Sequence, residues 1–460
     1  MVLGRSTQKE YLEQFYNKPG SQLIVMYGDK GMGKTTLLQE FMQGKEACYY
    51  QARPCSDKEQ AHLWSMELRE SGQGKLSSYP DFADLTEFIQ SETGTDKKLV
   101  LIVDEFQHIV KGSKEFIDSM VGLLHHMWGE RDALIILCSS CIGWVENSMV
   151  TRMGEAAFEI SGFLKIRELS FDVLYEYFKA SRPAEECISL YSILGGVPGA
   201  WKWVEPKKSF KENICNLFLT SDGALSRAAR DQVESQLRET NVYYTILAAM
   251  ASGSQKLNDL YHDTGFSRAK ISVYLKNLME LEIVEKVFSF DSEGRENTQK
   301  GIYRISNHLV NFYFRFLYPH LSALSMLEPE RFYDKYIRPE LAGYVAGFFR
   351  EICTQYLEQE NQQEHLPLTF VKSGEWVGKM GSLDFVAQDE EGKTLIGGCY
   401  CERSIMPYEK YEGWMECLKA AKLEADEIYL FAWEGVDQRI QDMAQQEDKV
   451  HIVSWRKLYT

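Results

Sequence analysis

The chain has 460 residues, with 51 basic and 67 acidic side chains, so its formal net charge is −16. A chain with this net charge repels the phosphates of nucleic acids overall, so any contact with DNA or RNA needs a local basic patch. Hydrophobic residues make up 44% and aromatic residues 13%, which excludes a mainly disordered chain; the length predicts about three domains.

The sequence has no pattern typical of a membrane helix, a signal peptide or a cysteine zinc site. No apolar stretch approaches the ~20 residues that a membrane helix needs, and the first residues lack the apolar core of a signal peptide. We therefore expect a cytoplasmic protein without membrane contact, whose ten cysteines are free thiols. Cys138 and Cys141 form one CxxC pair and Cys399 and Cys401 one CxC pair. Neither has a partner pair at zinc-site spacing, so buried thiols are expected.

The pattern changes along the chain and predicts four parts. Strand-like apolar runs first alternate with amphipathic helices, which is typical of a parallel sheet. A helical stretch follows, then short helices with two β-rich pieces joined by a polar hairpin tip, then mixed α and β segments. The predicted parts are residues 1–165, 166–235, 236–325 and 326–460, with the two β-rich pieces at 283–290 and 301–305 and the tip at 291–300.

A glycine-rich loop carries the strongest chemical signal. It fits the pattern GxxxxGK[ST], follows an apolar strand at 23–27 and opens a helix at 35–42. Glycines let backbone N–H groups converge on phosphates, and the helix N-terminus adds the positive end of its dipole. Lys34 is expected to reach the β and γ phosphates, and the Thr35 hydroxyl to bind Mg²⁺. The alternative is a glycine-rich turn without nucleotide. The predicted nucleotide-binding residues are Gly28, Asp29, Lys30, Gly31, Met32, Gly33, Lys34, Thr35 and Thr36.

Acidic and polar residues follow two further strands. A buried strand at 99–103 ends in Asp104 and Glu105. Asp104 is expected in the Mg²⁺ shell, and Glu105 as the general base that polarises the attacking water. Two acids at a solvated strand end are the alternative. The strand at 134–137 runs into polar residues that would sense the γ-phosphate or simply start a loop. Arg152 is a candidate for stabilising charge on the leaving phosphate, or a surface arginine.

These motifs together resemble the archaeal-type ATPase family, a P-loop group related to the AAA and STAND NTPases. Leu3-Gly4-Arg5 with Glu10 resembles its entry motif, and Asp104-Glu105-Phe106-Gln107 its Walker B motif. Leu194-Gly195-Gly196-Val197-Pro198 resembles the motif of its helical lid, where the resemblance places Pro198 near the adenine. From pattern alone, the same residues are a helix stop and a turn. The resemblance covers nearly the whole chain.

The third part reads as three helices and a β-wing, the winged helix-turn-helix layout of the family. The helices are expected at 242–250, 257–263 and 268–281, with Ser267 as N-cap of the last. Basic side chains that would meet phosphates are offset by interspersed acids, so DNA contact competes with protein docking, self-association or a purely structural role. The basic residues are Lys256, Arg268, Lys270, Lys276, Arg295 and Lys300. The aromatic-rich segment 307–317 is expected to pack in the core.

In the family the last part resembles a PD-(D/E)xK nuclease, whose metal chemistry needs two acids and a lysine. Asp384 matches the first acid. Gly398 stands where the second acid belongs and Tyr400 where the lysine belongs, while Arg350 replaces a family glutamate. We therefore expect a nuclease-like fold without nuclease activity.

The fold expected is α/β: a P-loop NTPase parallel sheet with a helical lid, a winged helix-turn-helix, and a restriction-endonuclease-like domain. The function expected is an ATP-binding, Mg²⁺-dependent ATPase that acts as a nucleotide-driven switch. A non-hydrolysing, nucleotide-bound scaffold that binds DNA or protein is the alternative.

Overall fold

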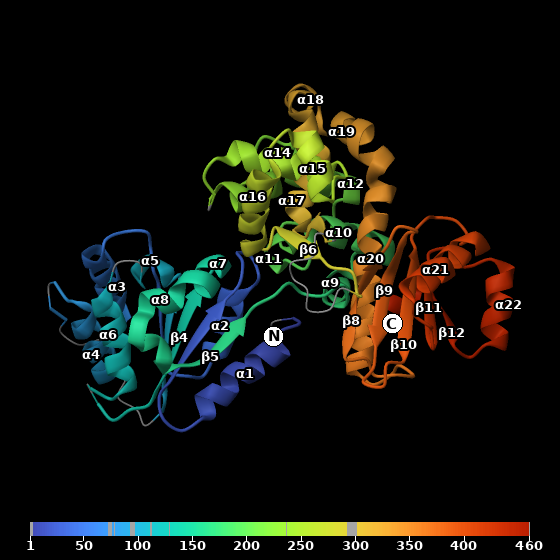
Figure 1. The fold of residues 1–460 in the computed structure, drawn as a ribbon. Helices are drawn as coiled ribbons and strands as arrows, with labels where there is room; N and C mark the ends of the chain where they lie inside the picture. The colour runs from blue at the N-terminus through green and yellow to red at the C-terminus, as the bar shows by residue number, and fades with distance from the viewer. Residues whose placement is uncertain are drawn as a thin grey trace. The chain divides into compact units, whose positions relative to one another are not determined.

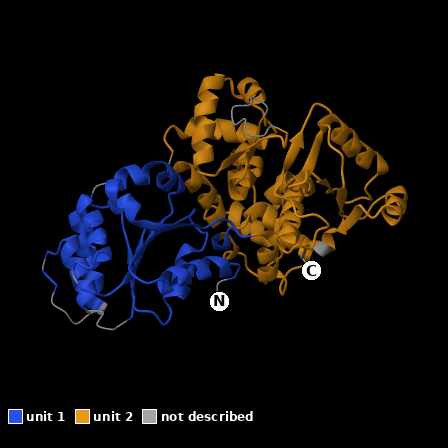
Figure 2. Cartoon of the chain, turned by 60° about the horizontal axis from the view of Figure 1, so that its bottom comes forward, with its two compact units in different colours: residues 1–169, 197–199 blue, residues 170–196, 200–460 orange. Residues whose placement is uncertain are grey.

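The computed structural model describes residues 3–71, 76–77, 79–92, 97–110, 113–127, 129–235, 237–291 and 301–459. The chain separates into two compact units, shown in Figure 2: residues 1–169 with 197–199, and residues 170–196 with 200–460. The short segment 197–199 thus belongs to the first unit, although both flanking segments belong to the second. Among the described residues, every helix is too short or too polar to cross a membrane.

The first unit is an α/β domain built on a five-stranded sheet in the order β2-β3-β4-β1-β5. All four neighbouring pairs are parallel, so the strand ends that carry the predicted motifs meet at one edge. The strands are β1 (Gln22–Tyr27), β2 (Ala47–Gln51), β3 (Leu99–Asp104), β4 (Ala133–Ser139) and β5 (Ile160–Lys165). The helices are α1 (Ser6–Asn17), α2 (Lys34–Met42), α3 (Asp57–Ser71), α4 (Phe82–Glu92), α5 (Gln107–Val110), α6 (Lys114–Leu124), α7 (Ile142–Trp144) and α8 (Val150–Met153).

Both faces of this sheet are covered, so β3 and β4 are buried along their whole length and are apolar up to the polar residues at their carboxyl ends. Alternate strand residues such as Leu101 and Ile135 pack with Trp64 of α3, Phe88 of α4 and Phe116 of α6 in one buried cluster. Figure 1 shows α1 and α2 apart from that group of helices. The sequence prediction of a parallel P-loop sheet is confirmed.

The second unit contains helices, a two-stranded β6-β7 hairpin and a second five-stranded sheet. Its first helices are α9 (Phe171–Phe178), α10 (Ala184–Leu194), α11 (Pro198–Trp201, which begins in the first unit), α12 (Phe210–Ile214) and α13 (Ala224–Glu234). The next elements are α14 (Thr240–Ala251), α15 (Leu257–Thr264), α16 (Arg268–Glu280), β6 (Val284–Val287), β7 (Ile302–Ile305), α17 (His308–Phe312), α18 (Leu321–Met326) and α19 (Pro329–Phe332). The last are α20 (Arg338–Gln362), β8 (Lys372–Val377), β9 (Ser382–Gln388), β10 (Thr394–Tyr400), α21 (Tyr408–Ala421), β11 (Glu427–Ala432), α22 (Gln438–Gln446) and β12 (Val450–Ser454).

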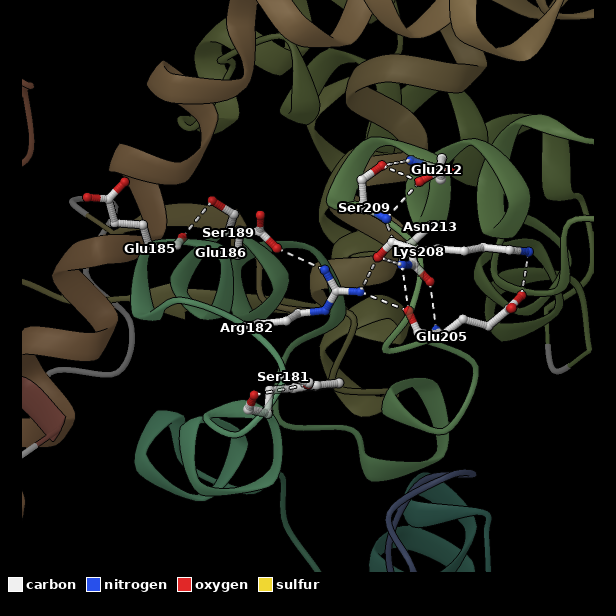
Figure 3. A network of polar contacts seen from close by, with 11 residues as sticks. Ser181, Arg182, Glu185, Glu186, Ser189, Glu205, Lys208, Ser209, Glu212 and Asn213 are labelled. Atoms are coloured by element: carbon white, nitrogen blue, oxygen red, sulfur yellow. Dashed lines mark hydrogen bonds and ion pairs between the residues drawn. The ribbon is translucent and has the colours of Figure 1, made fainter.

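A buried arginine organises the irregular chain between α11 and α12 (Figure 3). Arg182 is 6% exposed and forms an ion pair with Glu186 at 2.8 Å. Its guanidinium also donates to the backbone carbonyls of Glu205 and Lys208, at 2.9 and 2.8 Å. Asn213 donates to the same two carbonyls. These side chains hydrogen-bond to backbone carbonyls that lie outside any helix. They therefore hold the segment between α11 and α12 in place although it has no regular secondary structure.

The winged helix has the predicted elements. Helices α14, α15 and α16 precede the antiparallel β6-β7 hairpin, and the Ser267 side chain accepts from the backbone N–H of Lys270 as an N-cap. Gly265 ends α15 with φ +70°, a conformation that favours glycine. Most of the hairpin tip at 291–300 lies outside the described residues. The aromatic segment after β7 is helical, and Phe312, Phe314 and Phe316 are buried as expected of core.

The C-terminal sheet has the order β12-β11-β10-β9-β8 and is mixed. β10 runs parallel to β11 and antiparallel to β9, so the strand direction changes at β10. Trp414 of α21 and Ile440 of α22 pack in one buried cluster with Ile396 and Leu430 of the sheet. Figure 1 shows α20 beside the sheet, away from α21 and α22.

Candidate functional site

The glycine-rich loop lies at the carboxyl end of β1 and leads directly into α2 (Figure 1). Gly31 and Gly33 have φ values of +83° and +86°, which turn the backbone so that the loop closes onto the helix N-terminus. At Gly28 a Cβ atom would lie 2.2 Å from the carbonyl oxygen of Ile166, so only glycine fits there. The three glycines are thus required by backbone shape, as the phosphate-loop pattern predicts.

Lys34 is the first residue of α2, and its ammonium lies over the loop. Its Nζ donates to the backbone carbonyls of Gly28, at 2.7 Å, and Asp29, at 3.0 Å. The residue is 7% exposed, and no described carboxylate lies within ion-pair distance of it. Among the described residues its partners are neutral carbonyls, which leaves the side chain available to pair with an anion.

The Asp104 carboxylate ends β3 next to the start of α2. The Thr35 hydroxyl donates to its Oδ2 at 3.4 Å, and the backbone N–H of Glu105 donates to its Oδ1 at 2.9 Å. The structure therefore brings together the two residues predicted to organise Mg²⁺. A hydroxyl and a carboxylate are ligands that Mg²⁺ accepts, with water and phosphate oxygens completing an octahedron. The residues present fit the metal.

Glu105 has a left-handed backbone, with φ +54°, that turns its side chain toward the end of β4. Its Oε2 accepts from the Ser140 hydroxyl at 2.7 Å, the Ser140 backbone N–H at 3.2 Å and the Gln107 amide at 2.5 Å. Burial raises the pKa of Glu105, but these hydrogen bonds and the charge of Lys34 outweigh it and leave the pKa below its usual range. Glu105 is therefore an ionised carboxylate at neutral pH.

Sequence reasoning missed one contact to this carboxylate pair. The Tyr49 hydroxyl, from the neighbouring strand β2, donates to Asp104 Oδ2 at 2.8 Å. An aromatic residue in a short strand reads as packing, so the sequence offers no signal for this role. The sequence predicts polar residues after the strand at 134–137, and Ser140 is one of them. It does not predict the hydrogen bond from Ser140 to Glu105.

Two segments that are distant in sequence brace the loop. Arg5 is 3% exposed and donates to the carbonyls of Met32 and Arg167, both at 2.8 Å. Burial lowers the pKa of Arg5 to about 10, so the guanidinium stays charged. The Gly199 N–H donates to the Gly31 carbonyl at 2.8 Å, and the Pro198 ring lies 3.6 Å from where a Cβ on Gly33 would be. The entry and lid motifs thus both meet the loop.

The remaining predicted residues differ in exposure. Lys30 and Thr36 are exposed on the loop and on α2, and the side chain of Met32 is buried. Arg152 is exposed on α8, and its side chain forms no ion pair with the described residues. Its role in charge stabilisation stays a prediction.

In the C-terminal domain an indole fills the space of the missing acid. A Cβ on Gly398 would lie 2.5 Å from the Trp414 ring. Asp384 Oδ2 instead accepts from the Cys399 backbone N–H at 2.9 Å, and burial raises the pKa of Asp384. Tyr400 donates to Glu402 at 3.0 Å. The described residues contain no cluster of three or more acidic, histidine or cysteine side chains that would hold a metal.

Several basic side chains of the winged helix contact other residues of the same domain. Arg268 lies 4.0 Å from the Tyr261 ring and hydrogen-bonds to Asn258, and Lys270 lies 4.7 Å from the Phe266 ring. Lys276 pairs with Glu280 at 3.8 Å. Arg295 and Lys300 lie outside the described residues.

Comparison with known proteins identifies three regions. Residues 3–204 match an ATPase domain predominantly from Archaea, residues 245–286 a bacterial regulatory protein of the arsR family, and residues 313–403 archaeal and bacterial proteins of unknown function. An uncharacterized protein of Methanocaldococcus jannaschii is 24% identical over 398 residues, 86% of each chain. An uncharacterized ATP-binding protein of the same organism is 35% identical over 46 residues, 10% of this chain and 78% of that one.

Similar solved structures include a Walker-type ATPase of Pyrococcus abyssi, with 15% identity, a TM-score of 0.48, and coverage of 68% of this chain and 96% of that one. The Aeropyrum pernix ORC2 protein has 14% identity, a TM-score of 0.43, and coverage of 70% and 94%. The first matched region contains the parallel sheet and the glycine-rich loop, and the second contains α15 and α16. Residues 3–204 therefore match an ATPase domain found predominantly in Archaea and have the P-loop NTPase fold, and a winged helix and a C-terminal α/β domain follow them.

Proposed function

We propose that this protein is a Mg²⁺-dependent ATPase in which the bound nucleotide acts as a switch. The observation that carries the proposal is the Lys34 ammonium, which is buried over the loop and, in the part of the chain that the structure describes, has the Gly28 and Asp29 carbonyls as its hydrogen-bond partners. A β,γ-phosphate group would supply the anion that this cation lacks, and the N–H groups at the start of α2 would supply further donors.

In this proposal Thr35 and Asp104 hold the cation, which when bound neutralises charge on the phosphates. Glu105 accepts a proton from the attacking water, because its pKa keeps it ionised at neutral pH. Ser140 and Gln107 fix Oε2 of this carboxylate by three hydrogen bonds, which leaves Oε1 as the oxygen that would face the water. Arg152 is the proposed partner for charge on the leaving phosphate.

The switch would act through residues 197–199. This segment packs on the loop through the Gly199–Gly31 hydrogen bond, follows α10 after a two-residue turn and contains the start of α11. A nucleotide that shifts the loop would therefore act on the start of α11. Loops that change with phosphate occupancy are a common means of switching in NTPases.

Two variants test the binding and hydrolysis steps separately. Lys34→Ala removes the cation and is expected to abolish ATP binding measured by calorimetry. Glu105→Gln retains shape and hydrogen bonding but cannot take a proton, so it is expected to bind ATP and to release phosphate at least 100-fold more slowly, as loss of a general base implies. Wild-type turnover in Glu105→Gln would refute the base assignment.

The non-hydrolysing scaffold remains the second candidate, since loop geometry alone serves binding as well as hydrolysis. Phosphate release in steady state, with and without DNA, separates the two. A rate near background in both conditions favours the scaffold. A rate that DNA stimulates, together with a salt-dependent gel shift, would favour a DNA-linked ATPase acting through α16.

A further inference from the structure

The Tyr49 hydroxyl lies at the carboxylate that ends β3, although Tyr49 is outside every recognised motif. In the parallel β2-β3 pair, Tyr49 is in register with Ile102, and Gln51 with Asp104. The side chain therefore reaches forward along the sheet to place its hydroxyl 2.8 Å from Asp104 Oδ2. The Thr35 hydroxyl approaches the same oxygen at 3.4 Å. One oxygen of Asp104 thus has donors from both β2 and α2.

Every donor that the structure gives Asp104 is electrically neutral. Tyr49 and Thr35 donate to Oδ2, the Glu105 backbone N–H donates to Oδ1, and the Cys138 thiol also hydrogen-bonds to this carboxylate. Asp104 is 3% exposed, and within the described part of the chain it forms no ion pair. These donors orient the carboxylate without forming an ion pair with it.

We infer that Tyr49 is a positioning residue for the divalent cation: its hydroxyl fixes the Asp104 carboxylate in the orientation that faces Thr35. This inference rests on the proposed function. A phenol suits the task because it is a neutral donor that orients the carboxylate. A lysine or arginine in its place would pair with the carboxylate and compete with the metal cation. Without the hydroxyl, the side chain of Asp104 would sample other rotamers, and part of the binding free energy would be spent on ordering it.

The chain offers a matched control in the adjacent residue. Tyr50 is on the same strand, but its hydroxyl bonds to Gln60, at 2.6 Å to Oε1, on the other face of the sheet. Tyr49→Phe and Tyr50→Phe each remove one phenol hydroxyl from β2. Only the first removes a donor to Asp104, so a general weakening of the strand would affect both.

The test is a titration of Mg²⁺ in the full-length protein, with binding of a fluorescent ATP analogue as the readout. Tyr49→Phe is expected to raise the Mg²⁺ concentration at half-saturation about tenfold, the effect of losing one hydrogen bond to a charged group. Binding of the analogue in EDTA is expected to change less than about twofold, because the loop and Lys34 are intact. Tyr50→Phe is expected to keep the wild-type Mg²⁺ midpoint, and Asp104→Asn to lose the Mg²⁺ response.

The outcomes separate the two claims. If the wild-type protein binds the analogue with no response to Mg²⁺, the proposed function is wrong and the inference falls with it. If the wild type responds and Tyr49→Phe has the same midpoint, only the inference is overturned. A lower midpoint in Tyr49→Phe also overturns it, since the hydroxyl would then compete with the cation. An equal rise in both tyrosine variants would make the effect structural.

Discussion

The backbone N–H of Gly199 donates to the carbonyl of Gly31 at 2.8 Å, across 168 positions of sequence. The two glycines are so close that a Cβ on Gly199 would lie 2.7 Å from the Gly31 Cα. The phosphate loop is therefore shaped by a segment that reaches it from beyond α10, as well as by its own glycines.

Gly199→Ala is expected to weaken ATP binding by about tenfold, because the methyl group must push the Gly31 backbone away. Calorimetry with ATP and Mg²⁺ measures the effect. The control is Gly343→Ala, since a Cβ on Gly343 of α20 meets nothing within 4 Å. Equal affinity in Gly199→Ala and wild type would show that the loop tolerates displacement.

Arg5→Ala is expected to weaken nucleotide binding and to lower stability. The variant leaves the carbonyls of Met32 and Arg167 without their donor in a buried position, which costs about 1–3 kcal/mol. Thermal unfolding with and without ATP measures both effects. Lys9→Ala in α1, the helix that begins directly after Arg5, removes a partly exposed ion pair with Glu40; it is the comparison and should cost less than about 1 kcal/mol. A smaller loss in Arg5→Ala than in Lys9→Ala would contradict a bracing role.

Ser140→Ala is expected to move the acid limb of the ATPase pH profile upward. The hydroxyl stabilises the ionised form of Glu105, whose pKa lies below its usual range, so its removal raises that pKa. The base is then protonated at a higher pH, and activity falls earlier as the pH is lowered. Rates between pH 4 and 8 measure the shift, and Ser139→Ala, which leaves Glu105 Oε2 untouched, is the control. An unchanged acid limb would mean that another group sets it.

Gly398→Ala is expected to destabilise the C-terminal domain by about 1–3 kcal/mol, because the new methyl group meets the Trp414 ring. Gly413→Ala in the middle of α21 is the matched control. A Cβ there meets nothing within 4 Å, so this change should stabilise the protein by about 0.5–1 kcal/mol through helix propensity. Denaturant unfolding measures both. Similar free energies of unfolding for the two variants would show that the indole moves aside easily.

Local chemistry made much of the fold predictable. Short-range sequence patterns predict the phosphate loop, the strands β1, β3 and β4, and the Ser267 cap. Each of these features depends on residues that are close together in the sequence. The strand ends that carry Asp104 and Glu105 followed from the same reasoning, because parallel strands expose their carboxyl ends at one edge.

Contacts between distant segments were not predictable. Nothing in the pattern around Tyr49 distinguishes a phenol that bonds to Asp104 from one that bonds elsewhere, as Tyr50 does to Gln60. The absence of an acid at position 398 was visible, but the occupation of its space by Trp414 depends on how α21 packs against the sheet. Such contacts are decided by tertiary packing, which single-sequence periodicity does not encode.

The assignment of residues 197–199 to the first unit limits how this protein can be dissected. The chain passes between the two units at 169–170, again at 196–197 and a third time at 199–200. A fragment cut at position 169 would contain the entire five-stranded sheet and every motif residue from Arg5 to Arg152. It would nevertheless lack Gly199, which donates to the Gly31 carbonyl, and Pro198, whose ring lies beside Gly33. In a truncated ATPase domain the phosphate loop would therefore be exposed to solvent on the side that these two residues cover in the intact protein.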